Sequence, residues 1–384
     1  METRKLYYED SHLSRFSAEV LACRQTDAVW EVILSATAFY PEGGGQAGDS
    51  GRLSGVQVLD TRERDGAVVH LCDGALPVGQ TVEGAVDYEP RFLRMQQHSG
   101  EHIVSGIINR RYGCHNTGFH MGADVITIDF DGVVPPQALP EIEAEANEAV
   151  WRNLPVRCWY PSPGELPNIP YRTKKQLAWP VRIVEIPGFD CCACCGTHVA
   201  ATGEIGVIKL VSAVGFRGGT RMEMACGKQA LALLNAAFDQ NRQVSQAFSA
   251  RMTETGEAAR RMNELLSAQK FRIFGLEKRF FAAIAAGYKG RGDTLHFEDA
   301  LSPDGVRELA DAIAEDCGGT AAVFSGSDET GYAYCLVTRQ GDLRQFGREL
   351  TAALRGRGGG KPAYQQGRVQ AAKGEIEAFF ASWL

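Results

Sequence analysis

The sequence predicts a multidomain α+β protein, in which a small β-barrel-like domain is followed by a mixed α/β domain, a long helical linker and a C-terminal α/β domain. Three observations predict this class. Strand-like segments separated by turns fill residues 1–90, strand and helix patterns mix over 91–226, and strand signals vanish over 227–287 before a new α/β pattern at 288–384. A chain of 384 residues, 44% of them hydrophobic, has room for two or three such domains.

Short β-rich segments characterise the first ninety residues. Residues 29–34, 56–59 and 67–71 are rich in Val, Ile and Leu and are separated by Gly and Asp, which predicts a small, mostly antiparallel β domain. Inside it, residues 39–46 read Phe-Tyr-Pro-Glu-Gly-Gly-Gly-Gln. Three glycines let backbone N–H groups approach a ligand closely, although most such loops are only tight turns.

Helices and strands are both predicted in the second domain. Residues 90–111 read as a helix, and residues 139–154 as a second one, because apolar residues recur there at helical spacing. Residues 123–130 alternate between apolar and polar side chains. Further β-rich segments lie at 181–186, 205–214 and 220–225. We therefore expect a sheet backed by helices.

The remaining chain is predicted to begin with one or two long helices over 228–286, which form a spacer or a dimerisation element. A break is expected at 253–256, since glycine costs about 1 kcal/mol inside a helix. Ser302-Pro303 then reads as an N-cap with proline in the first turn. The elements expected after it are a helix through Val306, Leu309 and Ile313, strands at 321–324 and 334–337, a helix at 343–354, a glycine-rich loop at 356–362 and a closing helix that ends at Phe379, Phe380 and Trp383.

Composition excludes several classes of protein. A formal net charge of -7 argues against a broadly basic surface for non-specific nucleic-acid binding, but it leaves room for a local basic groove. No apolar run approaches the ~20 residues of a membrane span, and the N-terminus has no apolar signal region. Eleven cysteines, an odd number, indicate reduced thiols and not a disulfide scaffold. We expect a cytoplasmic protein.

Two distant segments supply the ligand types that zinc prefers. His98 and His102 lie one helical turn apart on one face, so their imidazoles can converge on one ion. Cys194 and His198 can reach the same ion from a turn, in which Gly196 gives freedom to bend. Zinc accepts such a mixed set in tetrahedral geometry.

Two alternatives to this ligand set stay open at the level of sequence. Cys191, Cys192 and Cys195 form further ligand-spaced pairs with or beside Cys194, so which thiolate binds is not settled. Glu101 completes a His-x-x-Glu-His pattern, which is typical of metallopeptidases in which the glutamate activates water. Such a peptidase needs a third ligand, usually a carboxylate or histidine, whereas this chain offers Cys194 and His198.

Four motifs in a fixed order resemble those of one family. They are Thr37-Ala-Phe-Tyr-Pro-Glu-Gly-Gly-Gly-Gln46, Gln97-His-Ser-Gly-Glu-His102, Cys194-Cys-Gly-Thr-His198 and Gly218-Gly-Thr-Arg221. Together they resemble the editing module of alanyl-tRNA synthetases, most closely its free-standing form, the AlaX trans-editing proteins. The tail Gly356-Arg-Gly-Gly-Gly-Lys-Pro362 is similar to the C-terminal domain that these synthetases share with DHH phosphoesterases, which marks the long AlaX subclass. The resemblance covers nearly the whole chain.

The resemblance implies a zinc-dependent hydrolase that removes serine, or glycine, wrongly attached to alanine tRNA. It implies that one zinc is bound by His98, His102, Cys194 and His198. A preceding aminoacylation domain has no room before the glycine loop, so the chain is expected to edit and not to charge tRNA. The family often has glycine where Cys195 stands, and many synthetases have a glutamine near residues 114–120 that this chain lacks.

Further site residues follow from the same resemblance. Thr37 matches the threonine expected to sense a serine hydroxyl, and Gly44, Gly45, Gln46 and Thr117 are expected to bind substrate. Glu101 is a candidate general base or a partner of the zinc ligands. Four protein ligands leave zinc no open position, so we hypothesise either an expanded coordination or a metal that orients the substrate. The residues expected to contact tRNA are Arg217, Arg221, Arg357 and Lys361.

Three functions are therefore carried forward. The first is an aminoacyl-tRNA deacylase, the second a His-x-x-Glu-His peptidase, and the third a non-catalytic tRNA-binding protein with structural zinc. A homodimer through the helical linker or the C-terminal domain is compatible with each of them.

Overall fold

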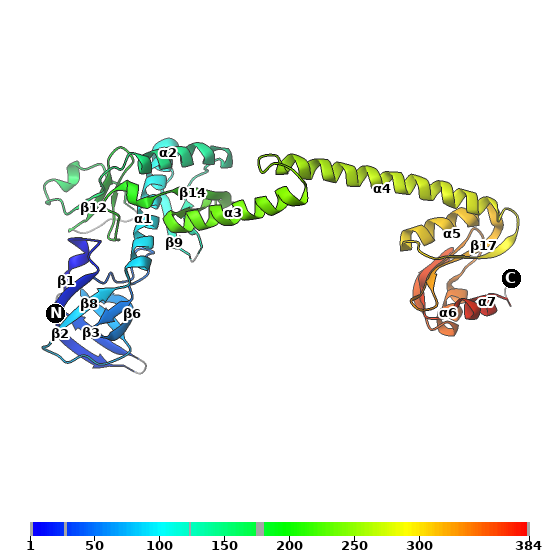
Figure 1. Ribbon diagram of the computed structural model, residues 1–384, viewed down its shortest axis with the longest axis horizontal. Coiled ribbons are helices and arrows are strands. Elements are labelled where there is room, and N and C mark those ends of the chain that lie inside the picture. Colours follow the sequence, from blue (N-terminus) through cyan, green and yellow to red (C-terminus); the bar gives the residue numbers. More distant parts are fainter. Residues whose placement is uncertain (1–2, 27–28, 123, 174–179, 382–384) are drawn as a thin grey trace. The chain divides into compact units, whose positions relative to one another are not determined.

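The computed structural model describes residues 3–26, 29–122, 124–173 and 180–381, and the chain divides into two units, Met1–Gln243 and Val244–Leu384 (Figure 1). Ala123, the predicted start of a strand, and Trp383, predicted in the closing helix, lie outside the described residues. No helix in the described part of the chain combines the length and the apolar character that a bilayer span requires. The division into four domains stays a prediction.

A closed barrel of short strands opens the first unit. Its strand order is β2-β3-β7-β6-β5-β8, and all neighbours run antiparallel. Alternate side chains such as Val20, Val32 and Leu34 fill its interior and are fully buried. The predicted β-barrel-like character is confirmed. The strands are β2 (Arg15–Gln25), β3 (Trp30–Leu34), β5 (Gly51–Leu53), β6 (Val56–Arg64), β7 (Ala67–Cys72) and β8 (Thr81–Val86), with β1 (Arg4–Lys5) paired to β4 (Ala36–Thr37) outside the barrel.

Helix α1 (Tyr88–Tyr112) leaves the barrel and forms the spine of the rest of the unit. Glu89 in its first turn and Arg110 and Arg111 in its last turn complement the helix dipole, and Gly113 ends it in the left-handed conformation at φ 67°. Ile103, Ile107 and neighbouring apolar residues pack into a core with α2 (Leu139–Trp151) and an antiparallel sheet. That sheet has the order β14 (Ile208–Phe216), β15 (Gly219–Cys226), β10 (Ile126–Phe130), β9 (Asn116–Met121).

A second, three-stranded antiparallel sheet carries the cysteine-rich segment. Its order is β11 (Arg157–Trp159), β12 (Ile183–Ile186), β13 (Asp190–Ala193). The expected sheet backed by helices is thus present, but as two sheets. Short 3-10 helices occur at Leu6–Tyr8, Pro136–Ala138, Leu166–Asn168 and Thr202–Ile205.

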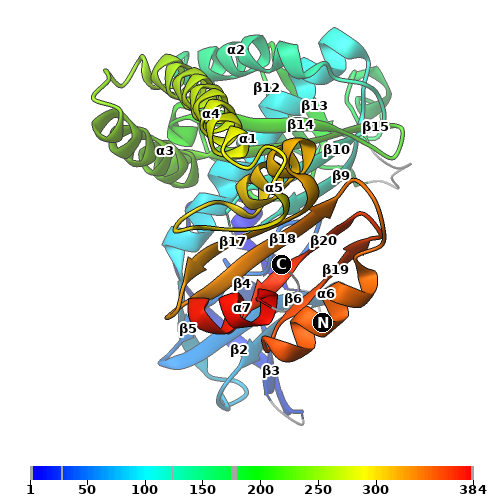
Figure 2. The same cartoon turned by 90° about the vertical axis from the view of Figure 1, so that its right-hand side faces the viewer.

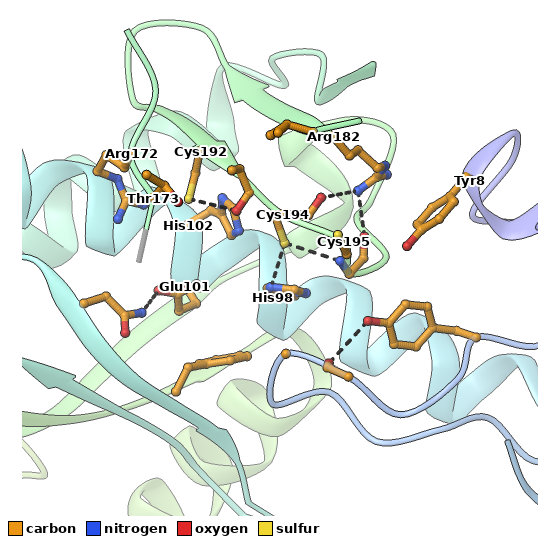
Figure 3. A pocket seen from close by; sticks show the side chains of 18 of the residues that line it. Tyr8, His98, Glu101, His102, Arg172, Thr173, Arg182, Cys192, Cys194 and Cys195 are labelled. Atoms are coloured by element: carbon orange, nitrogen blue, oxygen red, sulfur yellow. Dashed lines mark hydrogen bonds between the residues drawn. The ribbon is translucent and has the colours of Figure 1, made fainter. Parts of the chain in front are cut away.

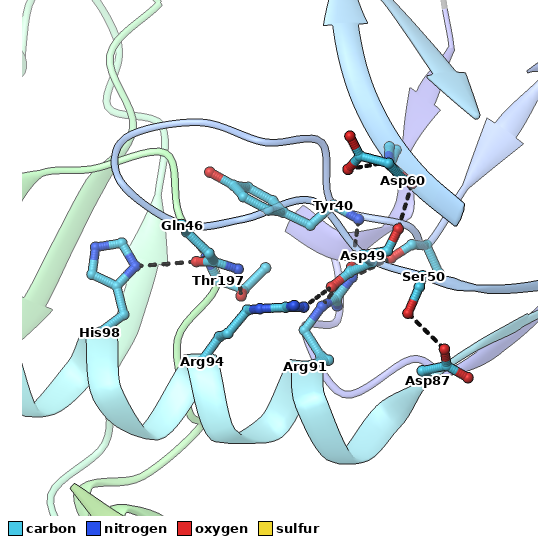
Figure 4. Close-up of polar contacts among 12 residues, drawn as sticks. Tyr40, Gln46, Asp49, Ser50, Asp60, Asp87, Arg91, Arg94, His98 and Thr197 are labelled. Carbon is cyan, nitrogen blue, oxygen red and sulfur yellow. Dashed lines mark hydrogen bonds and ion pairs between the residues drawn. The ribbon is translucent and has the colours of Figure 1, made fainter. Parts of the chain in front are cut away.

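A buried ion pair locks the barrel onto α1 (Figure 4). Arg91, from the first turn of α1, donates to the Asp49 carboxylate and, at 2.6 Å, to the carbonyl oxygen of Ala38. The same carboxylate accepts the backbone N–H of Tyr40 at 2.7 Å. These contacts to Ala38 and Tyr40 fix the glycine loop of the barrel against α1. Removal of either charged partner would leave the other charge buried and unpaired. His98 lies seven residues, or about two turns, further along the helix.

Two long helices occupy the stretch for which one or two were predicted. They are α3 (Gly227–Ala247) and α4 (Thr255–Ala286), with the break at residues 248–254. Gly256 falls in the first turn of α4 and not in the break, because the helix tolerates glycine near its start, where backbone N–H groups lack helical partners anyway. The predicted position of the break is therefore correct to within a few residues.

The second unit contains one sheet covered on both faces. Its order is β16 (Gly292–Glu298), β17 (Gly318–Ser327), β18 (Gly331–Thr338), β20 (Tyr364–Val369), β19 (Arg357–Lys361). One face packs on α5 (Pro303–Cys317) and the end of α4, and the other packs on α6 (Arg344–Ala353) and α7 (Lys373–Phe380), which lie side by side in Figure 2. Ser302 caps α5, as predicted, since its hydroxyl accepts the N–H of Gly305 at 3.0 Å.

The prediction of a glycine-rich loop at residues 356–362 is wrong for most of that segment. Arg357–Lys361 forms the edge strand β19, which pairs along its length with β20. Glycine has a low strand propensity, but backbone pairing needs no side chain, and the absence of side chains brings Gly358 close to Gly367. Composition alone therefore concealed this strand.

Candidate metal centre

Four side chains from two elements converge in the first unit. Figure 3 shows three of them, His98, His102 and Cys194. His98 and His102 come from successive turns of α1, and Cys194 and His198 from the loop after β13. One nitrogen or sulfur atom from each residue lies within 4.8 Å of those of the other three. The Nε2 atoms of His98 and His198 are each 3.4 Å from Cys194 Sγ. This is the only group of four metal-binding side chains in the described part of the chain.

The three imidazoles are oriented by partners on their outer nitrogens. In each ring, Nδ1 forms a hydrogen bond with an outer partner, and Nε2 is the nitrogen available to a metal at the centre of the cluster. Such outer partners fix the tautomer and orientation of histidines that bind metals. The arrangement is therefore typical of a metal site and not of three core histidines. The partners are Gln46 Oε1 for His98 at 3.3 Å, Asp190 Oδ2 for His102 at 2.8 Å and Ser99 Oγ for His198 at 3.1 Å.

Among the clustered cysteines, Cys194 is the one set up as a thiolate. Burial alone would raise its pKa, but the neighbouring imidazoles of His98 and His198 outweigh burial and hold the pKa of this thiol well below its usual value. Burial instead raises the pKa of Cys191 and of Cys192 to about 11. Since the thiolate is the form that binds metals, the structure favours Cys194 over its neighbours.

A second group, His102, Asp190 and Cys192, shares one histidine with the first. Its carboxylate is already occupied, because Arg172 donates to both Asp190 oxygens at 2.7 and 2.9 Å. Although burial opposes ionisation, His102 and Arg172 hold the pKa of the Asp190 carboxyl below its usual value. Asp190 is therefore better described as the charged partner that orients His102 than as a ligand.

Close packing fixes the ring of His98. Phe119 stacks on it with ring centroids 5.3 Å apart, and a Cβ atom at Gly196 would lie 2.1 Å from its Cε1 atom. The backbone of Gly196 does not adopt a positive φ. The predicted reason for this glycine, its freedom to bend, is therefore not the one that the structure shows. Glycine is needed here because a side chain at this position would collide with the His98 imidazole.

A cavity of about 580 Å³ opens beside the four side chains. Of the residues predicted to bind substrate, Gly44 and Thr117 line it, and so does Glu101. Gly45 instead packs against Phe119, and Gln46 supports His98 from behind. The cavity is lined by Tyr8, Tyr40, Pro41, Glu42, Gly43, Gly44, Glu63, His98, Glu101, His102, Asn116, Thr117, Gly118, Phe119, Arg172, Thr173, Pro180, Val181, Arg182, Cys192, Ala193, Cys194, Cys195 and Gly196.

Thr37 does not lie among the described residues that line this cavity. It is fully buried in the barrel domain, where its hydroxyl lies 2.8 Å from His70 Nε2 and accepts the N–H of Phe39 at 3.1 Å. His70 Nδ1 faces the carbonyl oxygen of Val32, so that nitrogen carries the proton and Nε2 accepts from Thr37. The Thr37 hydroxyl thus donates its one hydrogen bond to His70 and accepts one within the barrel domain, and the side chain is fully buried. The direct contact with a serine hydroxyl that the resemblance implied is therefore not expected from this position.

Three residues of the site carried no signal in the sequence. Arg172 and Asp190 hold His102, and Arg182 donates to the carbonyl oxygens of Cys194 and Gly196, both at 3.0 Å, and so holds the loop with the thiol. Arg172 and Arg182 are not metal-ligand types, and Asp190, although four residues before Cys194, lies outside the four motifs. Asp190 belongs to β13, Arg172 pairs with that strand through an isolated bridge to Cys192, and Arg182 directly precedes β12, so only the folded chain brings the three together.

The four basic residues expected to contact tRNA are separated between the two units. Arg221 pairs with Asp129 through two hydrogen bonds of 2.7 and 2.8 Å, and its guanidinium lies 3.6 Å from the ring centre of Phe216. Arg217, at φ 49° in the turn between β14 and β15, stacks on the same ring at 5.0 Å. Arg357 and Lys361 lie exposed on β19. In the first unit, Arg221 is therefore held by an ion pair with Asp129, whereas the contact found for Arg217 is its stacking on Phe216.

Two family models match parts of the chain. Residues 181–224, which include Cys194 and His198, match the second additional domain of threonyl and alanyl tRNA synthetases, and residues 4–90 match class II (A) tRNA synthetases. The second match covers the barrel and the glycine loop.

Similar curated proteins cover nearly the whole chain. The alanyl-tRNA editing protein AlaX-L of Pyrococcus horikoshii is 28% identical, over 97% of this chain and 96% of its own length. The alanyl-tRNA editing protein Aarsd1 of Danio rerio is 26% identical, over 96% of this chain and 95% of its own length. The alanine–tRNA ligase of Thermofilum pendens is 32% identical over 97% of this chain, but the chain spans only 43% of that ligase.

Proposed function

We propose that this chain, an AlaX-type editing protein by its family matches and near-full-length relatives, hydrolyses the ester between a wrong amino acid and alanine tRNA. One observation carries the proposal. Three oriented imidazoles and a thiolate converge at the wall of a cavity, and the segment that carries two of them lies in the part of the chain that matches the synthetase domain.

The four side chains fit zinc. Three imidazole nitrogens and one thiolate are ligands that zinc binds tetrahedrally, and the outer partners of the imidazoles complete such a site. Zinc bound there would supply Lewis acidity toward the ester carbonyl. The other side chains then have to bind and orient the aminoacyl group, since an aminoacyl ester is already activated. The hydrogen bonds of Arg182 to the loop and the Asp190–Arg172 ion pair hold the ligand side chains in position while the ester is bound and hydrolysed.

The size of the cavity suits the end of a charged tRNA. A seryl group has about six non-hydrogen atoms and, at roughly 30 Å³ for each, fills no more than ~180 Å³ of the space. The cavity of about 580 Å³ therefore has room for a terminal nucleoside as well. At its wall, Arg182 lies 4.8 Å from the ring centre of Tyr8, and Tyr160 meets the same ring edge-on at 6.2 Å. Aromatic rings of this kind stack with nucleic-acid bases.

Serine is the proposed amino acid, with glycine as a second substrate. The cavity wall is polar around Glu101, Asn116 and Thr117, so a small hydrophilic side chain loses little hydration there. Discrimination against alanine then has to come from these lining groups, because the Thr37 hydroxyl is committed to His70.

Deacylation of mischarged alanine tRNA tests the proposal. His98→Ala and Cys194→Ser should each lose bound zinc and at least ~100-fold in rate, because either change removes a ligand. His115→Ala and Cys191→Ser are matched controls. His115 is exposed and pairs with Asp131, and neither residue lines the cavity. Full activity in the two ligand variants would remove the basis of the proposal, as would wild-type protein that binds zinc but does not hydrolyse the ester.

The wider setting follows from the same activity. Charged tRNA is the proposed partner, and the cytoplasm, where charged tRNA is used, is the proposed location. We also propose a homodimer through α4, which exposes large apolar side chains including Phe271, Ile273 and Leu276. Sedimentation analysis that shows only monomers at micromolar concentration would contradict the dimer.

A further inference from the structure

One residue that lines the cavity carries a buried acceptor without a partner among the described residues. Asn116, the first residue of β9, lines the cavity and is only 5% exposed. Its Nδ2 donates to Glu101 Oε1 at 2.5 Å. Its Oδ1 is buried and has no hydrogen-bond partner among the described residues. An unpaired buried acceptor costs roughly 1–3 kcal/mol, and such groups in native proteins require an explanation.

The orientation of the amide is dictated by Glu101. A carboxylate only accepts, so the NH₂ group of Asn116 has to face it and the oxygen has to face elsewhere. The opposite orientation would place two acceptors together. The unpaired oxygen is therefore a property of the site and not an arbitrary choice between two equivalent amide positions.

The cations close to Glu101 are already committed. Glu101 is 4% exposed and accepts only neutral donors in the described structure, from Asn116 and, at 2.5 Å, from Ser105 Oγ. Arg172, which interacts electrostatically with Glu101, gives two hydrogen bonds to Asp190. His102 also donates to Asp190. The wall thus combines a carboxylate that has no ion pair with an acceptor that has no donor.

We propose that Asn116 Oδ1 and the Glu101 carboxylate bind the α-ammonium group of the aminoacyl ester. An ammonium brings three donors and a positive charge, which match an unpaired acceptor beside a carboxylate. Glu101 lines the same cavity as His98 and His102, so an ammonium held by Glu101 keeps the neighbouring ester carbonyl in the cavity beside the metal centre. The inference rests on the proposed function and adds a specificity: free aminoacyl esters are substrates, and esters whose amino group is blocked or replaced are rejected.

An isosteric substrate pair tests this subsite. In glyceroyl-tRNA a hydroxyl replaces the ammonium of seryl-tRNA and nothing else changes. A hydrogen bond to a charged group alters an equilibrium by roughly 10- to 100-fold, so the wild type should hydrolyse the seryl ester faster by about that factor in kcat/KM. Asn116→Leu should reduce this preference at least ~5-fold. Asn116→Ala gives the same readout where the leucine variant does not fold.

Thr117→Val is the matched control. Thr117 is the next residue of β9 and also lines the cavity, but its hydroxyl already donates to the carbonyl oxygen of Asp129 at 3.1 Å. Because the two esters carry the same side chain, any loss of rate that this variant causes applies to both, and the ratio of seryl to glyceroyl hydrolysis should survive. A wild type without the preference, an Asn116 variant that keeps it, or a Thr117 variant that loses it equally would each overturn the subsite.

Binding separates the subsite from the proposed reaction. The stable amide analogues, seryl- and glyceroyl-amino-deoxyadenosine, can be titrated calorimetrically into the zinc-loaded wild type and Asn116→Leu. A seryl preference that depends on Asn116 supports the ammonium subsite even if no ester is hydrolysed, in which case only the proposed function fails. Equal affinities for the two analogues in an enzyme that does hydrolyse seryl-tRNA would overturn the subsite alone.

Discussion

Replacement of Gly196 by alanine should disrupt the metal centre through one methyl group. The added Cβ would lie 2.1 Å from Cε1 and 2.3 Å from Nδ1 of His98, whereas ordinary contact begins at 3.4 Å. The imidazole would have to retreat by about 1.3 Å, while metal–ligand distances tolerate only about ±0.2 Å. The ring has little room to do so, because Phe119 stacks on it and Gln46 holds its Nδ1 atom.

The expected result is a loss of zinc affinity of roughly 10- to 100-fold, or about 1.4 to 2.7 kcal/mol, which is what misplacement of a supporting contact costs metal sites. Competition with a chromophoric chelator measures the affinity, and elemental analysis measures the zinc retained after purification. Gly215→Ala in β14 is the control, since a Cβ there meets nothing within 4 Å. Unchanged zinc affinity in Gly196→Ala would refute the role of this close contact.

Two further predictions concern the cavity wall and the barrel. Tyr8→Leu should raise KM for mischarged tRNA roughly 5- to 100-fold with little change in kcat, because base stacking contributes about 1–3 kcal/mol. Tyr88→Leu is the control and should leave KM unchanged, since Tyr88 does not line the cavity. An unaltered KM in Tyr8→Leu would count against a nucleoside at this wall. Burial lowers the pKa of His70 to about 4, below its ordinary 6.5, so its contribution to stability is complete above pH 6.5 and is lost as the pH falls toward 4. The free energy of unfolding should drop by up to about 3 kcal/mol across that window, and urea titrations of His70→Gln should show a smaller drop; parallel pH profiles would exclude this role for His70.

Elements with a strong local pattern were predictable. Helix α1 and strand β10 follow from apolar periodicity, and the cap at Ser302 follows from a side chain that bonds the third residue after it. Strand β19 was not predictable, because its glycines carry no side-chain signal and its pairing with β20 is purely backbone. The role of Gly196 was not predictable either, because it depends on the ring of His98, which lies about a hundred positions away in the sequence.

The sequence by itself determined the donor set of the candidate metal centre. His98 and His102 share a helix face because of their spacing, and Cys194 and His198 carry the matching ligand types. Tertiary structure alone decided which nitrogens face the centre, that Thr37 bonds His70 and stays off the cavity wall, and that Asn116, a residue of that wall, keeps a buried oxygen without a partner among the described residues. Spacing and ligand chemistry are local properties, whereas hydrogen-bond partners and cavity walls are set by packing between segments that are distant in the sequence.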